Sequence, residues 1–504
     1  MASIERERVL AHVVKGISAR PAQERSSLVR GFMGSALNLL PVGVRFGLLV
    51  SGVVCAFAVA HAQPAVQLEV RFSKPLAVFH YIRQLTPKAR PNPYKAQFEA
   101  SRFATAANLA RLEAFGAIRT DYEYNYPDYP DGKIEGSTAY ILKRNLIFAS
   151  SLADFRTRSI VVIPSGDLSA IASALQAFTP VYDALIYEPS RATFERQLAE
   201  IEALLTERQA AALFDRVRTF YRASWDPSVP FIFAFYPRPA GGGFSATAYG
   251  NVSESELPSD MTNYPMMLAL MLHEAAHILL DEQQRDAARE MQQWYSESQA
   301  TTSHYAKGLM QESWATAVGN GFFYERLTGA LNPGSWYGQP QISQMAKALL
   351  PLMRPYLEAA RPMDRALVHA YANLFERNFR GWLSEWEFLM MGRAVISERP
   401  ADFDLLDRRF PYRNVQKYLS DFSDTSLREL KATRATKLIV ISHDHAATLD
   451  RVRQAFPELA AWRPDLAADG TYAVMVADKT RLIVVSLISG SLEAQLRAPL
   501  PALP

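Results

Sequence analysis

The sequence contains a single cysteine among its 504 residues. That residue, Cys55, lies inside an apolar run near the N-terminus, from Phe46 to Ala60. If this run is removed as part of a signal peptide, the remaining chain has no thiol. Disulfides, a cysteine nucleophile and thiolate ligands for a metal are then all excluded. Any metal site would have to be built from histidine and carboxylate side chains.

A strong net charge is also missing, since the formal charge is only +3. Residues 1–62 hold seven basic and three acidic residues, so the rest of the chain carries a formal charge of −1. The sequence has no basic patch, P-loop or dinucleotide-binding fingerprint, and we therefore expect no nucleic-acid partner. A hydrophobic content of 49% is typical of a globular protein, and the length predicts two or three folded units.

Residues 1–62 are predicted to be an export signal. A basic flank ends at Arg45, and the apolar run is followed by the small-x-small sequence Ala60-His61-Ala62. The basic region is long, and a start at Met33 would give a signal of more typical length. Because a run of 15 residues is short for a membrane span, we expect cleavage after this sequence, with an uncleaved anchor as the alternative. The protein is therefore expected to be periplasmic or secreted in a bacterium, with no stable membrane span after cleavage.

The pattern of apolar residues predicts an α+β protein with a mainly helical C-terminal half and a small α/β appendage. The expected parts are an α+β domain over 63–225, a mainly helical domain over 226–395, a linker over 396–434 and a small α/β unit over 435–504. Strands are expected at "QLEVRF", "SIVVIP", "PFIFAFYP" and "GGGFSATAYGN". Single long helices are expected over residues 94–116 and 190–224, and a loop over 120–133.

The stretch "LALMLHEAAHILL" places two histidines and a glutamate in an otherwise apolar helix. Residues four apart lie on one face of a helix, so His273 and His277 can bind the same metal ion. Glu274, on the adjoining edge, can then take a proton from a water at that metal, which is the H-E-x-x-H arrangement of zinc enzymes. The alternative is a buried helix whose histidines hydrogen-bond locally. Buried glutamates are rarely left without a partner, which favours the shared cation.

Catalytic zinc needs a third protein ligand and an open position for water. The longer pattern H-E-x-x-H-x-x-G-x-x-H is absent, because Leu280 and Gln283 stand at its Gly and third His positions. Two candidates follow: His304 begins the next predicted helix, and Glu312 lies further along it, 35 residues beyond His277. Glu312 is the predicted ligand because its surroundings, "GLMQESWATAVGNGFF", carry almost no other charge. A solvated surface glutamate is the alternative.

The motifs "HEAAH" and "ESWAT" resemble those of the gluzincin type of zinc metallopeptidase, the broad thermolysin-like group. The resemblance covers roughly residues 241–330 and implies a zincin-like catalytic region with a peptide or protein substrate. It further implies that Glu274 is the general base and acid, and that Zn²⁺ is bound by His273, His277 and Glu312.

An edge strand ahead of the zinc helix often pairs with the substrate backbone in such peptidases. "GGGFSATAYGN" is placed to do this, because glycines allow close backbone approach and an edge strand has free N–H and C=O groups. A plain hairpin with a glycine turn is the alternative. The residues predicted to bind substrate are Gly243, Phe244, Ser245 and Ala246.

Peptide hydrolysis also needs a hydrogen-bond donor for the developing oxyanion. His369 and Tyr371 are predicted for this role, with Tyr324 and Tyr337 as other candidates. Thermolysin has an aspartate four residues after the ligand glutamate, where it orients a zinc-binding histidine. Thr316 stands at that position here, and a hydroxyl is a weaker acceptor than a carboxylate.

The sequence thus predicts an exported zinc-dependent metallohydrolase, and the resemblance makes it a peptidase. The alternative is a non-catalytic extracytoplasmic binding or scaffold protein on a peptidase-like fold, in which zinc is structural or absent. The presence of Glu274 favours the enzyme, because a structural zinc site needs no base.

Overall fold

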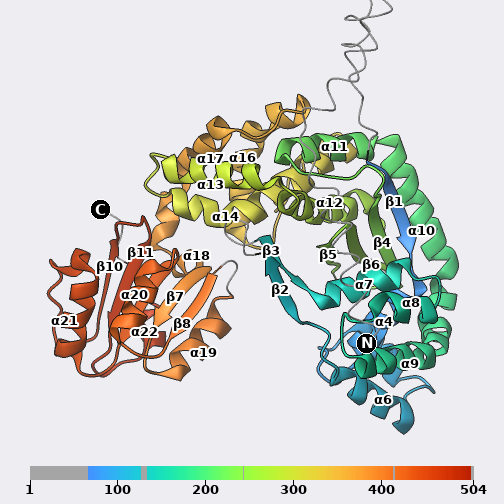
Figure 1. The fold of residues 1–504 in the computed structure, drawn as a ribbon, viewed down its shortest axis with the longest axis horizontal. Helices are drawn as coiled ribbons and strands as arrows, with labels where there is room; N and C mark the ends of the chain where they lie inside the picture. Colours follow the sequence, from blue (N-terminus) through green and yellow to red (C-terminus); the bar gives the residue numbers. More distant parts are fainter. Residues whose placement is uncertain (1–65, 127–132, 242, 412–414, 501–504) are drawn as a thin grey trace, which may run out of the picture. The chain divides into compact units, whose positions relative to one another are not determined.

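The computed structural model describes residues 66–504, except for 127–132, 242, 412–414 and 501–504 (Figure 1). The predicted export signal lies outside the described residues. The helices and sheets that are described form an α+β protein, as the sequence predicts. None of the helices in this part of the chain combines the length and the apolar character that crossing a bilayer requires.

A four-stranded sheet lies beside the helix that contains the H-E-x-x-H motif. Its strands are β1 (Leu68–Phe72), β4 (Phe231–Arg238), β5 (Ala246–Tyr249) and β6 (Val252–Pro258). Their order is β1-β4-β6-β5, with β1, β4 and β6 parallel and β5 antiparallel to β6. Strand β5 is therefore an edge strand. It is shorter than the predicted strand, and the chain ahead of Ala246 is loop.

The two faces of this sheet contribute to different hydrophobic cores. Alternate residues of a strand point to opposite faces. Phe231, Phe233 and Phe235 pack in the core that contains helix α12 (Tyr264–Asp281). Ile232, Ala234 and Tyr236 pack against the N-terminal helices. These helices are α4 (Lys74–Leu85), α5 (Pro93–Glu99), α6 (Ala106–Gly116), α7 (Thr138–Phe148), α8 (Leu152–Ser159) and α9 (Ser165–Tyr182).

Helix α12 carries the H-E-x-x-H motif. Its N-terminus is capped by the side chain of Asn263, which accepts the backbone N–H of Met266, and Pro265 occupies the first turn. Apolar residues cover most of its circumference, as expected for a buried helix. It lies against β5, β6 and a π-helical segment, η3 (Ala317–Phe323).

Most of the chain from residue 183 to 389 is helical, apart from strands β4 to β6. The remaining helices are η2 (Asp183–Tyr187), α10 (Glu188–Glu207), α11 (Ala210–Tyr221), α13 (Arg285–Glu297), α14 (Ser303–Thr316), α15 (Tyr324–Thr328), α16 (Pro340–Glu358), α17 (Arg365–Phe379), η4 (Arg380–Ser384) and α18 (Trp386–Leu389). The prediction of one helix over 190–224 is wrong in detail, because the chain turns at Gln209, which has a φ of 50°.

The C-terminal unit is a five-stranded sheet in the order β10-β11-β9-β7-β8, with β10 antiparallel and the others parallel. Its elements are β7 (Gly392–Ile396), α19 (Pro400–Arg409), β8 (Val415–Leu419), α20 (Asp424–Ala432), β9 (Thr436–Ile441), α21 (His445–Ala455), η5 (Pro457–Leu459), β10 (Gly470–Met475), β11 (Arg481–Ser486) and α22 (Leu492–Gln495). The prediction of an irregular linker over 396–434 is therefore wrong. Its short segments bury Leu406, Leu427 and Leu430 against the sheet.

Three predictions for the N-terminal part also fail. The helix expected over 94–116 is two helices, because the Ser101 side chain bonds to the backbone of Phe98 and Phe103 and ends the first one. The expected loop over 120–133 contains strand β2 (Glu123–Tyr126), which pairs antiparallel with β3 (Lys133–Ser137), a strand that begins at the last residue of the expected loop. "SIVVIP" is a turn between α8 and α9, in which Val161 is 93% exposed.

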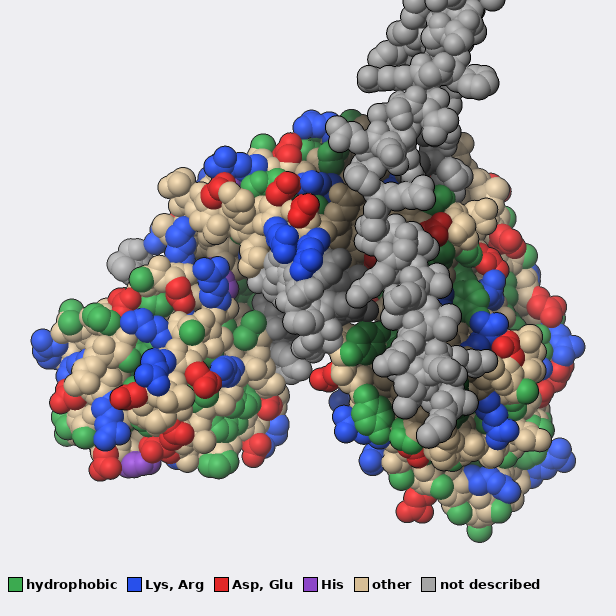
Figure 2. Space-filling view, viewed as in Figure 1, with side chains coloured by type: hydrophobic (Ala, Val, Ile, Leu, Met, Phe, Trp, Pro, Cys, Tyr) green, Lys and Arg blue, Asp and Glu red, His purple; other side chains and the backbone are tan. Residues whose placement is uncertain are grey.

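The surface carries both signs of charge. On the face drawn in Figure 2, the basic and acidic side chains of the described residues are interspersed, and no large patch of one sign stands out. This distribution is in line with the small formal charge of the chain.

Candidate metal centre

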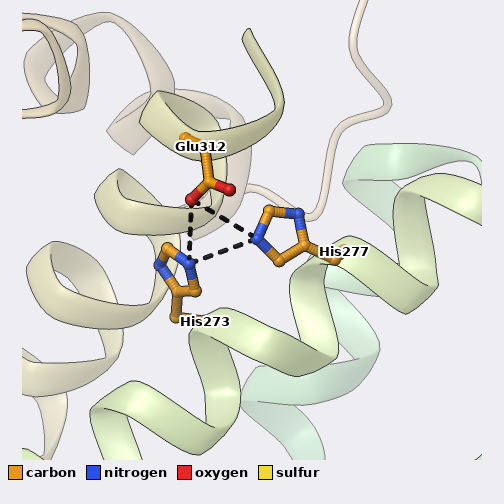
Figure 3. A group of neighbouring side chains, drawn as sticks. All are labelled: His273, His277 and Glu312. Carbon is orange, nitrogen blue, oxygen red and sulfur yellow. Dashed lines mark hydrogen bonds and ion pairs between the residues drawn. The ribbon is translucent and has the colours of Figure 1, made fainter. Parts of the chain in front are cut away.

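Three side chains from two helices converge on one point (Figure 3). His273 and His277 lie one turn apart on α12, and Glu312 comes from α14. The two Nε2 atoms are 3.2 Å apart, and Oε2 of Glu312 lies 3.5 Å from Nε2 of His273 and 3.8 Å from Nε2 of His277. Among the described residues, this is the one group of three or more His, Cys, Asp or Glu side chains whose ligand atoms lie within 4.8 Å of one another.

These distances fit a tetrahedral zinc ion. With metal–ligand bonds of about 2.0–2.1 Å, two ligand atoms at a tetrahedral angle lie about 3.3–3.4 Å apart. The observed separations of 3.2, 3.5 and 3.8 Å bracket this value. Two imidazoles and one carboxylate form a donor set of catalytic zinc sites, in which the fourth position is left to water or substrate. The residues present therefore fit Zn²⁺.

The cluster is buried at one end and open at the other. The side chain of His273 is 3% exposed, that of His277 19% and that of Glu312 31%. Burial, together with the neighbouring His273, lowers the pKa of His277 to about 4, so its imidazole is neutral and able to bind a metal at neutral pH. Burial acts to raise the pKa of Glu312, but the two histidines and a hydrogen bond from Tyr337 outweigh it and lower that pKa to about 2. The Glu312 carboxyl is therefore ionised over the physiological pH range, which is the form that can bind a metal.

Two further side chains contact the ligands. Oγ1 of Thr316 lies 3.4 Å from Nδ1 of His273, so Thr316 occupies the orienting position suggested by the sequence. With Nε2 of His273 directed at the cluster, its Nδ1 carries the proton and donates to the hydroxyl. Tyr337 donates to Glu312, and its ring centroid lies 5.9 Å from that of His273. Tyr337 is thus the one predicted oxyanion donor for which a contact with the cluster is found in the described residues.

Glu274 lies beside the cluster and against the edge strand. Burial raises the pKa of its carboxyl to about 7, and the nearby Glu312 acts in the same direction, whereas His273 and a hydrogen bond from the backbone N–H of Ala248 act against it. Ala248 belongs to β5, so its N–H points away from β6 and towards α12. Ala246, two residues earlier, directs its backbone groups to the same edge. The edge of β5 that does not pair with β6 therefore faces the H-E-x-x-H motif.

The residues predicted to bind substrate lie at the start of this edge. Ala246 is the first residue of β5, whereas Gly243, Phe244 and Ser245 form the loop that leads into it. The carbonyl of Gly243 accepts a hydrogen bond from Arg238, and that of Ser245 accepts one from Ser255. Phe244 packs against the core that contains α12. The structure thus places Ala246 on the strand beside Glu274, whereas Gly243 and Ser245 are held by hydrogen bonds and Phe244 by apolar packing.

Other predicted residues are not brought to the cluster. Tyr371 is fully buried, and its hydroxyl is bonded to the carbonyl of Ala306 and to Ser313, so it is not available to a substrate. Nε2 of His369 donates to the carbonyl of Trp294 on α13. The assignment of Tyr371 as an oxyanion donor is therefore wrong, and His369 has no observed contact with the three ligands.

The open alternatives for the third ligand are also placed elsewhere. His304, in the first turn of α14, lies near Asp478 and Lys437 of the C-terminal unit, and burial lowers its pKa to about 4. Gln283, at the third His position of the longer pattern, donates to the backbone carbonyl of Tyr221. Glu312 is the residue that joins the histidine pair.

The π-helical segment η3 brings Gly319 against the backbone of α12. A Cβ at Gly319 would lie 2.6 Å from the carbonyl oxygen of Ala269 and from both the N and the Cβ of His273. Only glycine permits this approach, which fixes the helix of Glu312 against the helix of His273. The sequence contained the glycine but gave no signal for a π-helix, a feature that is common at functional sites.

We expect Gly319→Ala to lower the free energy of unfolding by about 1–3 kcal/mol, because the added methyl group overpacks the contact between the two helices. It should also lower zinc affinity by about tenfold, since His273 must move. Urea unfolding and a competitive zinc titration measure the two effects. Gly166→Ala, where a Cβ meets nothing within 4 Å, is the matched control and should leave both values nearly unchanged. Wild-type zinc affinity in Gly319→Ala would contradict the assigned role.

Comparisons with known proteins do not add to this geometry: no family model, no curated protein and no solved structure matches the chain.

Proposed function

We propose that this protein is an exported zinc-dependent peptidase with a zincin-like catalytic region. The observation that carries the proposal is the convergence of His273, His277 and Glu312, with the carboxyl of Glu274 beside them. The antiparallel edge strand β5, whose outer edge faces the same point, supports a peptide as the substrate. This combination of two histidines, a downstream glutamate and an edge strand is similar to the arrangement expected of the gluzincin type.

In the proposed mechanism, zinc bound by the three ligands would polarise the scissile carbonyl and lower the pKa of a water molecule. Glu274 would accept a proton from the attacking water and later return it to the leaving amine. In the metal-free protein burial raises the pKa of this carboxyl to about 7, and a cation beside it would favour the carboxylate, which is the form that accepts a proton. The hydrogen bond from Ala248 holds this carboxyl at the edge of β5, next to an extended peptide bound along the strand.

Removing the metal tests the proposal directly. The protein is treated with a chelator, dialysed, and assayed on an unstructured protein such as casein before and after addition of zinc or magnesium. We expect hydrolysis to disappear with the metal, to return with a stoichiometric amount of zinc, and not to return with magnesium, which prefers oxygen ligands. Hydrolysis that survives complete metal removal, or a zinc-loaded protein without hydrolysis, would overturn the proposal.

We assign Tyr337 as the donor to the developing oxyanion. Its hydroxyl already lies at hydrogen-bond distance from Glu312 and can turn towards a substrate oxygen at the metal. Tyr337→Phe should therefore lower kcat by about 100-fold, the typical cost of losing one such donor. Tyr337 is a partner of Glu312 rather than a ligand, so zinc affinity should fall by no more than about 10–100-fold, and kcat is compared with zinc at saturation. Steady-state kinetics and metal analysis of the same sample check both expectations. An unchanged kcat would mean that Tyr337 is not the donor to the oxyanion.

A further inference from the structure

A buried guanidinium bonds to two backbone carbonyls of the loop ahead of β5. Arg238 is the last residue of β4, and its side chain is only 8% exposed. Its Nη2 donates to the carbonyl of Gly241 and its Nη1 to the carbonyl of Gly243, both at 2.6 Å. Nη1 also lies 3.0 Å from Oε2 of Glu256. The Arg238 guanidinium thus donates to two backbone carbonyls, and one carboxylate balances its charge.

Glu256 is fixed from the other side. It lies on β6, and its Oε1 accepts a hydrogen bond of 2.6 Å from Nε2 of His80 on α4. Nδ1 of His80 in turn accepts a hydrogen bond of 3.1 Å from the hydroxyl of Tyr236. Because both oxygens of the carboxylate have partners, the position of Arg238 is set by three elements of the scaffold rather than by the loop.

Further contacts hold the same loop. The backbone N–H of Gly241 donates to Oδ2 of Asp260 at 3.1 Å, and Gly241 has a φ of 91°, which favours glycine. The hydroxyl of Ser255 on β6 donates to the carbonyl of Ser245 at 2.8 Å. The loop is therefore tied to the sheet on both sides of its glycines and leads directly into Ala246 of β5.

We propose that Arg238 is a positioning residue that fixes the place of β5 beside Glu274, and that the proposed peptidase prefers extended peptides long enough to pair with this strand. The inference rests on the proposed function. A substrate strand gains hydrogen bonds from an edge only if that edge is held in place before binding, because ordering it during binding costs free energy. Arg238 supplies that order without touching the substrate.

The test compares two substrates on the zinc-loaded full chain. One is a quenched fluorescent peptide of about eight residues, which can pair with β5, and the other is a blocked dipeptide, which cannot. Arg238→Lys keeps the positive charge next to Glu256, but a single ammonium lacks the planar fork that reaches both carbonyls. We expect KM for the long peptide to rise about tenfold, kcat/KM for the dipeptide to stay within about twofold, and zinc content to be unchanged.

The chain offers a closely matched control. Arg393 on β7 is also fully buried, donates to the carbonyls of Met390 and Phe410, and pairs with Asp407, but it belongs to the C-terminal sheet. Arg393→Lys should lower stability without changing the preference for the long peptide. Arg238→Lys overturns the inference if it acts like this control, or if it weakens both substrates equally while zinc is retained.

A second variant keeps the test decisive if Arg238→Lys does not fold. Asp260 is exposed, so Asp260→Ala removes the anchor of Gly241 without disturbing a core. It should raise KM for the long peptide about threefold and leave the dipeptide unaffected, and equal kinetics for wild type and Asp260→Ala would then overturn the inference. A zinc-loaded wild type that cleaves neither substrate would instead overturn the proposed function, and the inference with it.

Discussion

Glu274→Gln is expected to abolish most of the hydrolytic activity while zinc stays bound. The amide has the shape of the carboxylate but cannot accept the proton of a water, and general base catalysis of this kind is worth about 10²–10⁴-fold in rate. Because Glu274 is not one of the three ligands, zinc content should not fall. The measurement is kcat/KM on a peptide substrate, with zinc determined in the same sample.

A control for Glu274→Gln is available on the neighbouring helix. Glu290 on α13 pairs with Arg222, and its side chain is half exposed. Glu290→Gln therefore makes the same chemical change as Glu274→Gln, but at a carboxylate that is far less buried. It should leave kcat/KM within about twofold of wild type. Retention of full activity by Glu274→Gln would mean that another residue, or none, serves as the base.

The pH dependence of stability should reveal the same carboxyl in the metal-free protein. Its pKa is raised from 4.5 to about 7 in the folded state. A group with a raised pKa stabilises the fold fully below its unfolded pKa, and this contribution is lost as the pH rises through the folded value. The metal-free wild type should therefore lose about 2 kcal/mol relative to Glu274→Gln between pH 5 and pH 8, as measured by urea unfolding. Parallel curves for the two proteins would contradict the assigned burial.

Glu312→Ala is expected to have the largest effect on metal binding. It removes one of three ligands and leaves an uncompensated pair of histidines, so zinc affinity should fall well beyond the roughly 10–100-fold that loss of an outer partner costs. A ligand whose free concentration is 100 times its Kd stabilises the folded state by about 2.7 kcal/mol. Zinc should therefore raise the melting temperature of the wild type but not that of Glu312→Ala.

Two variants at the same helix sharpen this test. Gln311 is the exposed neighbour of Glu312, and Gln311→Ala should bind zinc as the wild type does. Glu312→His replaces the carboxylate with an imidazole and should recover part of the affinity, since three histidines also form a zinc site. Equal zinc binding by wild type and Glu312→Ala would remove Glu312 from the site.

The centre of the site could be predicted from the sequence because its residues obey local rules. His273 and His277 share a helix face whatever the rest of the fold does. Glu312 stood out because a charged residue in a nearly apolar helix needs a partner. The approach of α14 to α12 and the contact of Thr316 with His273 then follow from the structure.

The parts that could not be predicted depend on contacts distant in sequence. Tyr337 lies in a loop without periodicity, and nothing in its neighbours indicates that it reaches Glu312. Tyr371 has the right residue type, but its hydroxyl is hydrogen-bonded to Ser313 and to the carbonyl of Ala306. Tertiary packing decides which neighbouring helix a side chain points towards, and the residue type alone does not show this.

Secondary structure failed where propensity and tertiary context disagree. The β-branched run at Ile160 to Ile163 predicts a strand, but within the part of the chain that the structure describes it pairs with no strand and forms the turn between α8 and α9. In the predicted linker, the strand β8 and the helices α19 and α20 are short. Their few buried apolar residues stand among many polar ones, so the sequence shows no clear apolar periodicity. The five-stranded sheet that they complete becomes recognisable only from its pairing.

The central claim is that one zinc ion is held by two histidines and one glutamate. X-ray absorption at the zinc edge of the purified protein tests it most directly. We expect one zinc per chain, with two imidazole nitrogens and the remaining ligands oxygen, at about 2.0–2.1 Å and without sulfur. A protein that binds no zinc, or a zinc ion with a sulfur ligand or with a number of imidazoles other than two, would contradict it.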